Sequence, residues 1–282
     1  DKAELLFFNA AQGARHPTES AICYLKTDNS YYLEGGKNGD TTDKKQTRYR
    51  YSPVHKEAAV CCVPNAGRIG PSYIQNMWMK DENALVATVL GPCTLNTKFN
   101  GQNISINELT NYPFENKIIF TINIEKRASF QLRIRKPAWA DSIHSNVAYK
   151  LENDFIVMDK KWDKSNRVII EFDTKPITKE ANKDEYYFTY GPLVLAHPIP
   201  ATEKITKQYP IAGLKEIVYK PINPVIYQYS NNAITKLPDN NPQTQGYEFS
   251  TLLYNPVTHK EEKIILQPMS KTILRQVTFK KK

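Results

Sequence analysis

The stretch Phe130-Gln131-Leu132-Arg133-Ile134-Arg135 alternates strictly between apolar and polar side chains. This two-residue period is typical of a β-strand with one buried face. Residues 117–124 and 167–172 alternate more loosely, and turn-forming residues separate such runs at Asn100-Gly101, Asn153-Asp154 and Lys164-Ser165-Asn166. Short strands at this spacing predict an antiparallel β-sandwich over residues 83–183.

A second β-rich block follows from residue 184. It contains the apolar runs 186–195, 263–266 and 273–279, separated by residues 210–246, which are rich in Pro and Asn. These features predict a second antiparallel sandwich over residues 184–282, with a long loop between its early and late strands.

Residues 1–82 have helical apolar spacing instead. The segment from Ala3 to Gln12 predicts a helix that is buried on most sides and ends at Gly13. A second helix is expected to begin at Pro64 and to kink or restart at Pro71. The sequence therefore predicts a mixed α and β, multidomain protein with boundaries near residues 82 and 183.

Composition and charge limit the possible classes of function. The chain has 282 residues, 40% of them hydrophobic, which suits a folded globular protein. Its formal net charge of +9 is spread over scattered lysines, and the one dense run is Lys280 to Lys282. We therefore expect a solvated basic surface and no nucleic-acid partner. No run approaches the roughly 20 apolar residues of a membrane-spanning helix, so no membrane span is expected.

The adjacent pair Cys61-Cys62 is the most informative chemical feature. A helix starting just after the pair would place its positive end beside both sulfurs and favour the thiolate form. Two neighbouring thiolates repel each other unless a cation such as Zn²⁺ lies between them. The alternative is that both residues are small buried hydrophobes, and the residues alone leave these two interpretations open. A strained vicinal disulfide is less favoured, and Cys23 and Cys93 fit core positions better than metal sites.

The string Ala59-Val60-Cys61-Cys62-Val63-Pro64-Asn65 resembles the Cys-Cys-x-Pro-Asn motif of the β-L-arabinofuranosidase family of glycoside hydrolases. Other segments resemble the family in the same order along the chain: Ala3 to Ala11, Tyr112-Pro113-Phe114, residues 132–140 and Gly191-Pro192-Leu193-Val194. The order and spacing of these segments make the resemblance specific.

The resemblance implies the C-terminal part of an (α/α)6 barrel, at residues 1–82, followed by two antiparallel β-sandwich domains. It further implies Zn²⁺ held by three cysteines and a glutamate, and a retaining mechanism. By this resemblance Cys61 is the nucleophile and a zinc ligand, Cys62 is a structural zinc ligand, and Tyr24 contacts substrate. The expected enzyme is a glycoside hydrolase acting on furanosides of plant cell-wall glycans.

One family feature has no counterpart in this sequence. The Glu-x-Cys motif that supplies the remaining zinc ligands does not occur in the chain. His55 and Glu57 lie near enough to serve as substitutes, and Glu19 is near Cys23, but solvated loops explain these residues better. We expect the remaining ligands and the general acid to come from a missing N-terminal part of the barrel or from another chain, unless this branch has lost the metal.

Two functional hypotheses follow. The first is a furanoside-specific, zinc-dependent glycoside hydrolase, incomplete in this chain, in the periplasm or outside the cell. The second is a non-catalytic β-sandwich module that binds glycans or proteins and carries Cys61 and Cys62 as buried core residues. Metal content and the effect of Cys61→Ser on activity separate the two.

Overall fold

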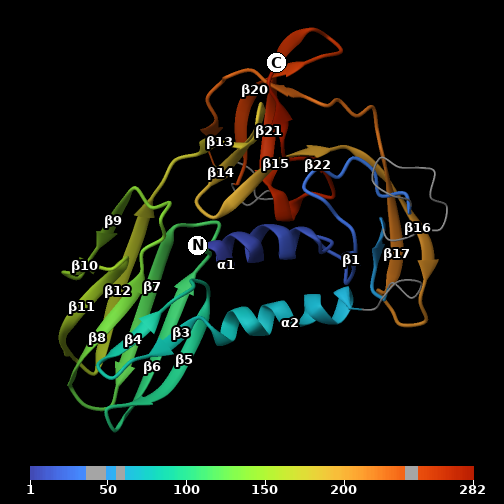
Figure 1. Ribbon diagram of the computed structural model, residues 1–282. Helices are drawn as coiled ribbons and strands as arrows, with labels where there is room; N and C mark the ends of the chain where they lie inside the picture. Colours follow the sequence, from blue (N-terminus) through green and yellow to red (C-terminus); the bar gives the residue numbers. More distant parts are fainter. Residues whose placement is uncertain (36–48, 55–60, 239–246) are drawn as a thin grey trace. The chain divides into compact units, whose positions relative to one another are not determined.

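The structure is a computed structural model that describes residues 1–35, 49–54, 61–238 and 247–282. The described residues form two compact units. The first consists of residues 70–174 with Asp1 and Ala3, and the second of residues 4–69 and 175–282 with Lys2. Strands dominate both units (Figure 1).

The first unit is built from two five-stranded sheets. One has the order β10-β11-β8-β4-β3, and the other has the order β5-β6-β7-β12-β9. The strands are β3 (Trp78–Lys80), β4 (Ala84–Ala87), β5 (Cys93–Phe99), β6 (Gln102–Thr110), β7 (Lys117–Ile124), β8 (Ala128–Arg135), β9 (Ser142–Ser145), β10 (Lys150–Glu152), β11 (Phe155–Trp162) and β12 (Ser165–Asp173). Most pairs are antiparallel, but β4 runs parallel to β8.

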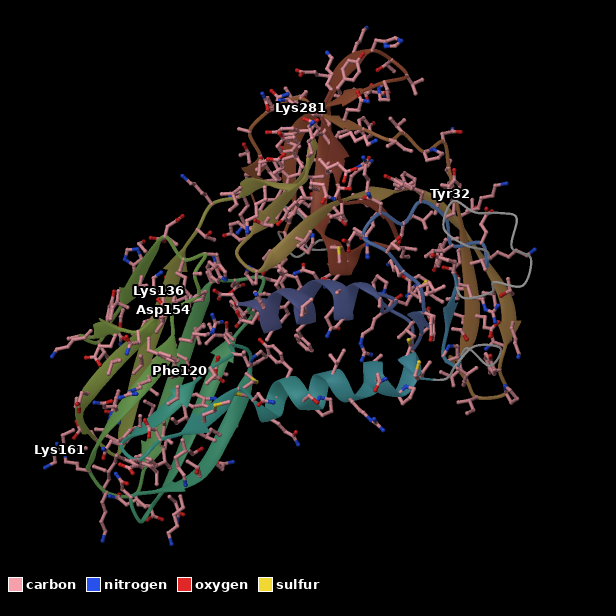
Figure 2. The ribbon with its side chains drawn as sticks, in the orientation of Figure 1. Tyr32, Phe120, Lys136, Asp154, Lys161 and Lys281 are labelled. Carbon is pink, nitrogen blue, oxygen red and sulfur yellow. The ribbon has the colours of Figure 1, made fainter. Side chains whose placement is uncertain are left out.

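Alternating side chains of the two sheets form the core of this unit. On β8, Phe130, Leu132 and Ile134 are buried, while the residues between them are partly exposed. Aromatic rings bridge the sheets: Phe99 and Phe130 lie 5.8 Å apart. Phe120 is fully buried, and Figure 2 shows it among the strands, whereas the exposed Lys161 lies at the periphery. Burying one large apolar side chain stabilises the fold by roughly 1.5–3 kcal/mol.

Two predicted turns have the backbone conformation that their residues favour. Asn100 and Gly101 join β5 to β6 with φ values of 49° and 75°. Asn153 and Asp154 join β10 to β11 with φ values of 47° and 64°. Consecutive positive φ values match the twist of a tight hairpin, so these residues fix the register of both strand pairs. The Asp154 carbonyl also accepts a hydrogen bond of 2.8 Å from the Lys136 amide (Figure 2).

The second unit contains a nine-stranded and a four-stranded sheet. The larger sheet follows the order β13-β14-β15-β21-β20-β18, with β19, β22 and β23 pairing off this path, and the smaller follows β1-β2-β17-β16. The strands are β1 (Ile22–Cys23), β2 (Tyr51–Ser52), β13 (Ile177–Asn182), β14 (Glu185–Tyr190), β15 (Leu193–Ile199), β16 (Ala201–Gln208), β17 (Lys215–Pro221), β18 (Gln228–Tyr229), β19 (Thr235–Lys236), β20 (Phe249–Asn255), β21 (Lys260–Pro268), β22 (Leu274–Gln276) and β23 (Phe279–Lys280).

The predicted barrel portion at residues 1–82 is wrong. Residues from this region enter a β-sheet: β1 pairs with β2, and Tyr51 of β2 pairs with Ile217 of β17. Tyr51 and Cys23 are buried in one core with Ile217 and Tyr219 from the C-terminal half of the chain. Helical spacing over short apolar runs did not reveal this pairing, because the partner strand lies more than 160 residues away. The prediction of a loop over residues 210–246 is also wrong in part, because strand β17 (Lys215–Pro221) lies within it.

Two helical segments lie within residues 1–82 of the described chain. The first comprises α1 (Lys2–Leu5) and a π-helical stretch, η1 (Leu6–Ala11), and the second is α2 (Cys62–Gln75). A short 3₁₀ helix, η2 (Met269–Lys271), follows β21. Neither segment has the burial of a barrel helix: Leu5 and Leu6 are exposed, and no residue of α2 is buried. Pro71 lies inside α2 and does not restart it, and no described helix is long and apolar enough to cross a membrane.

The Asn9 side chain ties η1 to the start of β15. Its amide nitrogen donates to the Pro192 carbonyl at 2.7 Å, and its amide oxygen accepts from the Val194 amide at 2.7 Å. A buried amide that satisfies both partners in this way holds the two backbones in fixed register. The segments Ala3 to Ala11 and Gly191 to Val194, which the sequence singled out separately, are therefore in direct contact.

Candidate functional site around Cys61 and Tyr24

Cys61 lies immediately before the first residue of α2. Its carbonyl accepts the first helical hydrogen bond, from the Asn65 amide at 3.1 Å. The helix begins at Cys62, two residues before the predicted start at Pro64. Pro64 remains within the first turn, where a helix needs no amide donor. Cys61 is exposed and Cys62 is half-buried, so neither is the fully buried core cysteine of the alternative interpretation.

Tyr24 is brought to Cys61 by a narrow hairpin that precedes it. The Cys23 amide donates to the Ala14 carbonyl at 2.8 Å, and the His16 amide donates to the Ala21 carbonyl at 2.9 Å. Tyr24 follows directly after β1, which this hairpin holds in place. The guanidinium of Arg15, on the same hairpin, donates to the Ala66 carbonyl of α2. The hairpin and the first turns of α2 are therefore joined beside the two sulfurs.

The Tyr24 hydroxyl lies 3.3 Å from the Cys61 sulfur. Donation of this hydrogen bond to the sulfur lowers the pKa of Cys61, and hydrogen bonds from Cys62 and from the backbone amides of both cysteines add to the effect. The same interaction raises the pKa of Tyr24 to about 12, first through Cys61 and then through Cys62. The phenol thus keeps its proton while the thiol loses its own more readily.

This arrangement can supply a nucleophile. A thiolate is the reactive form of cysteine, and it is favoured by hydrogen-bond donors and by a helix N-terminus. Cys61 has both, and it is open to solvent. Tyr24 supplies a ring and a protonated hydroxyl next to the sulfur, which suits contact with a sugar hydroxyl or ring face.

The two sulfurs match part of a zinc site. Cysteine sulfurs are preferred zinc ligands, but a zinc centre needs at least three protein ligands. Within the described ranges no group of three or more His, Cys, Asp or Glu side chains is placed to hold a metal ion. His55 and Glu57 lie outside the described residues. Glu19 is engaged elsewhere, in an ion pair with Lys215 at 3.0 Å.

The other two cysteines have unreactive surroundings. Cys23 is buried, and burial raises its pKa to about 12. Cys93 is half-buried, and burial raises its pKa to about 11 although the Trp78 indole donates to its sulfur at 3.3 Å. Neither thiol is poised to ionise near neutral pH.

Comparison with known protein families gives a match for residues 84–174. They match the family described as β-L-arabinofuranosidase, GH127 middle domain. The chain is related to the GH127 β-L-arabinofuranosidases. The resemblance inferred from the sequence is thereby confirmed. The matched segment lies within the first unit, whereas Tyr24, Cys61 and Cys62 precede it. A comparison with curated protein sequences gave no match.

Solved structures of GH127 proteins share the fold. A GH127 β-L-arabinofuranosidase from Geobacillus stearothermophilus T6 matches with a TM-score of 0.67 and 15% identity, over 99% of this chain and 46% of that chain. A GH127 β-arabinofuranosidase matches with a TM-score of 0.64 and 14% identity, over 99% and 45%. A third structure, described as a glycoside hydrolase, matches with a TM-score of 0.64 and 17% identity, over 98% of this chain and 47% of that chain. The chain thus spans less than half the length of these structures.

Two features of the site escaped sequence reasoning. The contact of Tyr24 with Cys61 joins residues 37 positions apart. The Arg15 side chain, which joins the hairpin to α2, carried no motif at all. Neither contact leaves a local signal, because each depends on how separate segments pack.

Proposed function

We propose that this chain is part of a retaining glycoside hydrolase that acts on furanosides, of the β-L-arabinofuranoside type, in plant cell-wall glycans. Cys61 is the nucleophile, and Tyr24 lines the sugar subsite beside it. The relation to GH127 supports the substrate class. The observation that carries the residue assignment is the 3.3 Å hydrogen bond between the Tyr24 hydroxyl and the exposed Cys61 sulfur at the start of α2.

The proposed reaction has two displacements. The Cys61 sulfur attacks the anomeric carbon, the glycosidic C–O bond breaks, and the leaving oxygen takes a proton from a general acid outside the described residues. A water molecule then gives a proton to the conjugate base of that acid and attacks the same carbon, and the C–S bond breaks, which returns the thiolate and releases the sugar with retained configuration. Tyr24 stabilises the thiolate before attack and after release, because it donates a hydrogen bond to the sulfur.

We propose that Zn²⁺ binds Cys61 and Cys62. When bound, this ion keeps the sulfurs deprotonated near neutral pH and moderates their basicity. The chain supplies two of the ligands, and the others come from outside the described residues, on a further part of the protein or on another chain. The partner of the site is a glycan, and a polymer-degrading role favours a periplasmic or extracellular location.

The proposal is tested by chemical labelling of the full-length protein that contains this chain. We expect an electrophilic affinity label with the β-L-arabinofuranosyl configuration to attach to Cys61, as mapped by peptide mass spectrometry. Cys61→Ser should lose the label and reduce hydrolysis of an aryl β-L-arabinofuranoside on the order of 10³-fold or more, because the nucleophile is gone.

Cys93→Ser is the matched control, since it removes a thiol of raised pKa in the other unit. It should keep both label and activity. Label on a different residue, or full activity in Cys61→Ser, would contradict the assignment of the nucleophile. Metal analysis tests the zinc proposal separately: near-stoichiometric zinc that falls in Cys62→Ser supports it, and an active metal-free protein contradicts it.

A further inference from the structure

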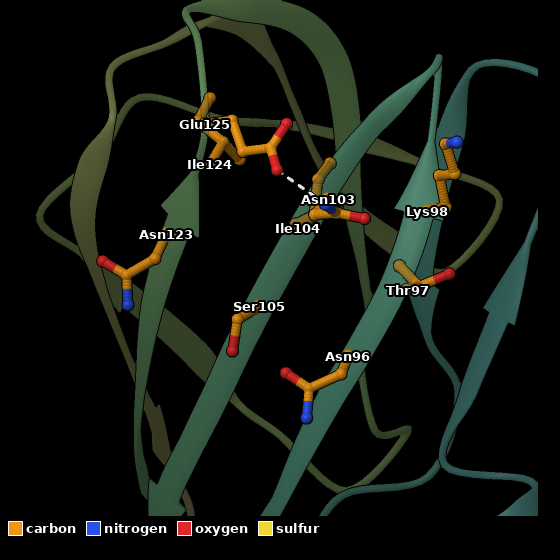
Figure 3. A pocket seen from close by; sticks show the side chains of 9 residues that line it. All are labelled: Asn96, Thr97, Lys98, Asn103, Ile104, Ser105, Asn123, Ile124 and Glu125. Carbon is orange, nitrogen blue, oxygen red and sulfur yellow. Dashed lines mark hydrogen bonds between the residues drawn. The ribbon is translucent and has the colours of Figure 1, made fainter.

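A polar face covers the outer side of three neighbouring strands in the first unit. At the ends of β5, β6 and β7 that border this face, Phe99, Ile104, Ile122 and Ile124 are buried, so the residues that alternate with them face outward. Together they line a shallow hollow of about 590 Å³ (Figure 3). We use the term polar face for six of its side chains: Asn96, Lys98, Asn103, Ser105, Asn123 and Glu125.

Strand register places three of these residues in one row. Asn96 pairs with Ser105 across β5 and β6, and Ser105 pairs with Asn123 across β6 and β7. Directly opposed residues on neighbouring strands point to the same side of a sheet, about 5 Å apart. Figure 3 shows the three side chains on adjacent strands. An amide, a hydroxyl and an amide thus form a ladder across the hollow.

The ladder has unused hydrogen-bonding capacity. In the part of the chain that the structure describes, the side chains of Asn96, Ser105 and Asn123 have no hydrogen-bond partner. Asn103 and Glu125, in the next row, are paired by a hydrogen bond of 2.6 Å that fixes both side chains at the edge of the hollow (Figure 3). Each asparagine amide offers two donors and an acceptor, and the serine hydroxyl offers one donor and two lone pairs.

The charge of the polar face selects among possible ligands. Lys98 and Glu125 are its only charged residues, and their formal charges cancel. Nucleic acids and acidic polymers need several cations, whereas one lysine is present. Protein interfaces depend on aromatic and apolar anchors, and the two isoleucines in the lining, Ile104 and Ile124, are buried. The donors and acceptors that remain match a neutral ligand rich in hydroxyl groups.

We propose that the polar face binds a neutral oligosaccharide, with its sugar hydroxyls hydrogen-bonded to Asn96, Ser105 and Asn123. The site is non-catalytic and independent of the chemistry at Cys61. Each hydrogen bond to a sugar replaces one to water, so its net contribution is small. The lining has no aromatic side chain on which a sugar could stack. Binding is therefore weak, with a dissociation constant on the order of 1 mM. We expect such a site to hold a polysaccharide through several weak contacts along its length.

The test uses the full-length protein that contains this chain, labelled with ¹⁵N and assigned at the polar face, and titrated with arabino-, xylo- and cello-oligosaccharides as probes. We expect concentration-dependent shifts in the signals of Asn96, Ser105 and Asn123, including the side-chain amides, with at least one of these neutral probes. The double variant Asn96→Ala/Asn123→Ala should weaken that binding roughly tenfold.

Ser105→Ala and Ser129→Ala form a matched pair on the same unit. Ser105 is in the centre of the ladder, whereas Ser129 is exposed on β8 of the other sheet. Ser105→Ala should weaken binding and Ser129→Ala should not. The proposal is overturned if the signals of the polar face stay unchanged up to the solubility limit of every neutral probe. It is also overturned if they move only with oligogalacturonides, which would indicate an acidic ligand at Lys98.

Discussion

Cys23 and Cys61 both adjoin Tyr24, the first through the chain and the second through space, but their surroundings are opposite. Cys23 lies in the buried core of the smaller sheet, and its pKa rises to about 12 because burial disfavours the charged thiolate. Cys61 lies in solvent at the start of α2, and its pKa falls because the Tyr24 hydroxyl donates to the sulfur. Two cysteines on either side of one tyrosine therefore have pKa values shifted in opposite directions.

The region around Cys23 is shaped by buried cations. Arg275 is almost fully buried, and its guanidinium donates to four carbonyls, those of Gly13, Thr27, Asp28 and Met269. The Lys26 ammonium donates to the Tyr51 hydroxyl and to the Thr272 carbonyl, and burial lowers the pKa of Lys26 well below its usual range. Each of the three guanidinium nitrogens of Arg275 has a backbone acceptor, so this buried polar group supports the fold.

The difference between the two sulfurs predicts a large contrast in alkylation. Burial raises the pKa of Cys23 to about 12, whereas the hydrogen bond from Tyr24 holds the pKa of Cys61 below its ordinary value. Near neutral pH the thiolate fraction of Cys61 should therefore greatly exceed that of Cys23. Treatment of the native protein with iodoacetamide, followed by peptide mass spectrometry, should label Cys61 first and Cys23 only after unfolding. Earlier labelling of Cys23 would contradict the contrast.

Removing the buried guanidinium of Arg275 should strongly destabilise the second unit. Arg275→Met leaves four carbonyls without their donor, and we expect a loss of roughly 3–5 kcal/mol in the free energy of unfolding. Urea denaturation followed by fluorescence measures it. Arg68→Met is the control, because Arg68 is exposed on α2 and belongs to the same unit. Equal effects of both substitutions would show that the buried contacts of Arg275 contribute little.

Tyr24→Phe should lower the rate at which Cys61 is alkylated and leave the fold intact. The ring remains, but the hydrogen bond that most strongly lowers the pKa of Cys61 is lost. In the metal-free protein, we expect the pKa of Cys61 to rise and its alkylation at neutral pH to slow several-fold. The pH dependence of the alkylation rate measures this shift. Tyr32→Phe, at an exposed tyrosine of the same unit, should have no effect. An unchanged pH profile in Tyr24→Phe would show that the Tyr24 hydroxyl does not lower the pKa of Cys61.

His16, under the smaller sheet, should add a modest pH dependence of stability. Its Nδ1 accepts hydrogen bonds from the Thr18 and Glu19 amides, so the folded state holds a neutral ring whose Nε2 faces the Tyr219 hydroxyl. Burial lowers the pKa of His16 below 6.5, and the unfolded chain therefore binds the proton more tightly. This contribution is complete above pH 6.5 and declines as the pH falls toward the lowered pKa.

Chemical denaturation above and below pH 6.5 measures this smallest of the four effects. The slope of stability against pH should flatten in His16→Gln, which keeps a polar side chain but cannot titrate. The same slope in the variant and in the natural protein would assign the pH dependence to other groups.

The first unit shows how far strand patterns extend. Strict alternation at Phe130 to Arg135 predicted the buried and exposed faces of β8, and Asn100-Gly101 and Asn153-Asp154 predicted two hairpins. These features depend on residues close together in the chain. The boundaries at residues 82 and 183 stay predictions. The parallel pairing of β4 with β8 was not predicted, since local alternation carries no direction.

The second unit shows where such patterns fail. The segment around Ala21 and Cys23 became part of a sheet only through pairing with distant strands. The expected barrel portion rested on helical spacing and on family resemblance, and neither shows what covers a helix. The π-helical stretch η1 is likewise joined to a distant segment, through the hydrogen bonds of Asn9 with Pro192 and Val194.

The sequence by itself determined the relation to β-L-arabinofuranosidases, the local β pattern of the first unit, and the choice of Cys61-Cys62 as the candidate functional site. Tertiary structure alone decided that the Tyr24 hydroxyl meets the Cys61 sulfur, how the N-terminal residues enter a sheet, and that Asn96, Ser105 and Asn123 stand in one row. The physical reason is the separation along the chain of the residues that interact. Periodicity and turn chemistry act over a few residues, whereas burial, pKa shifts and rows of side chains arise where distant segments meet.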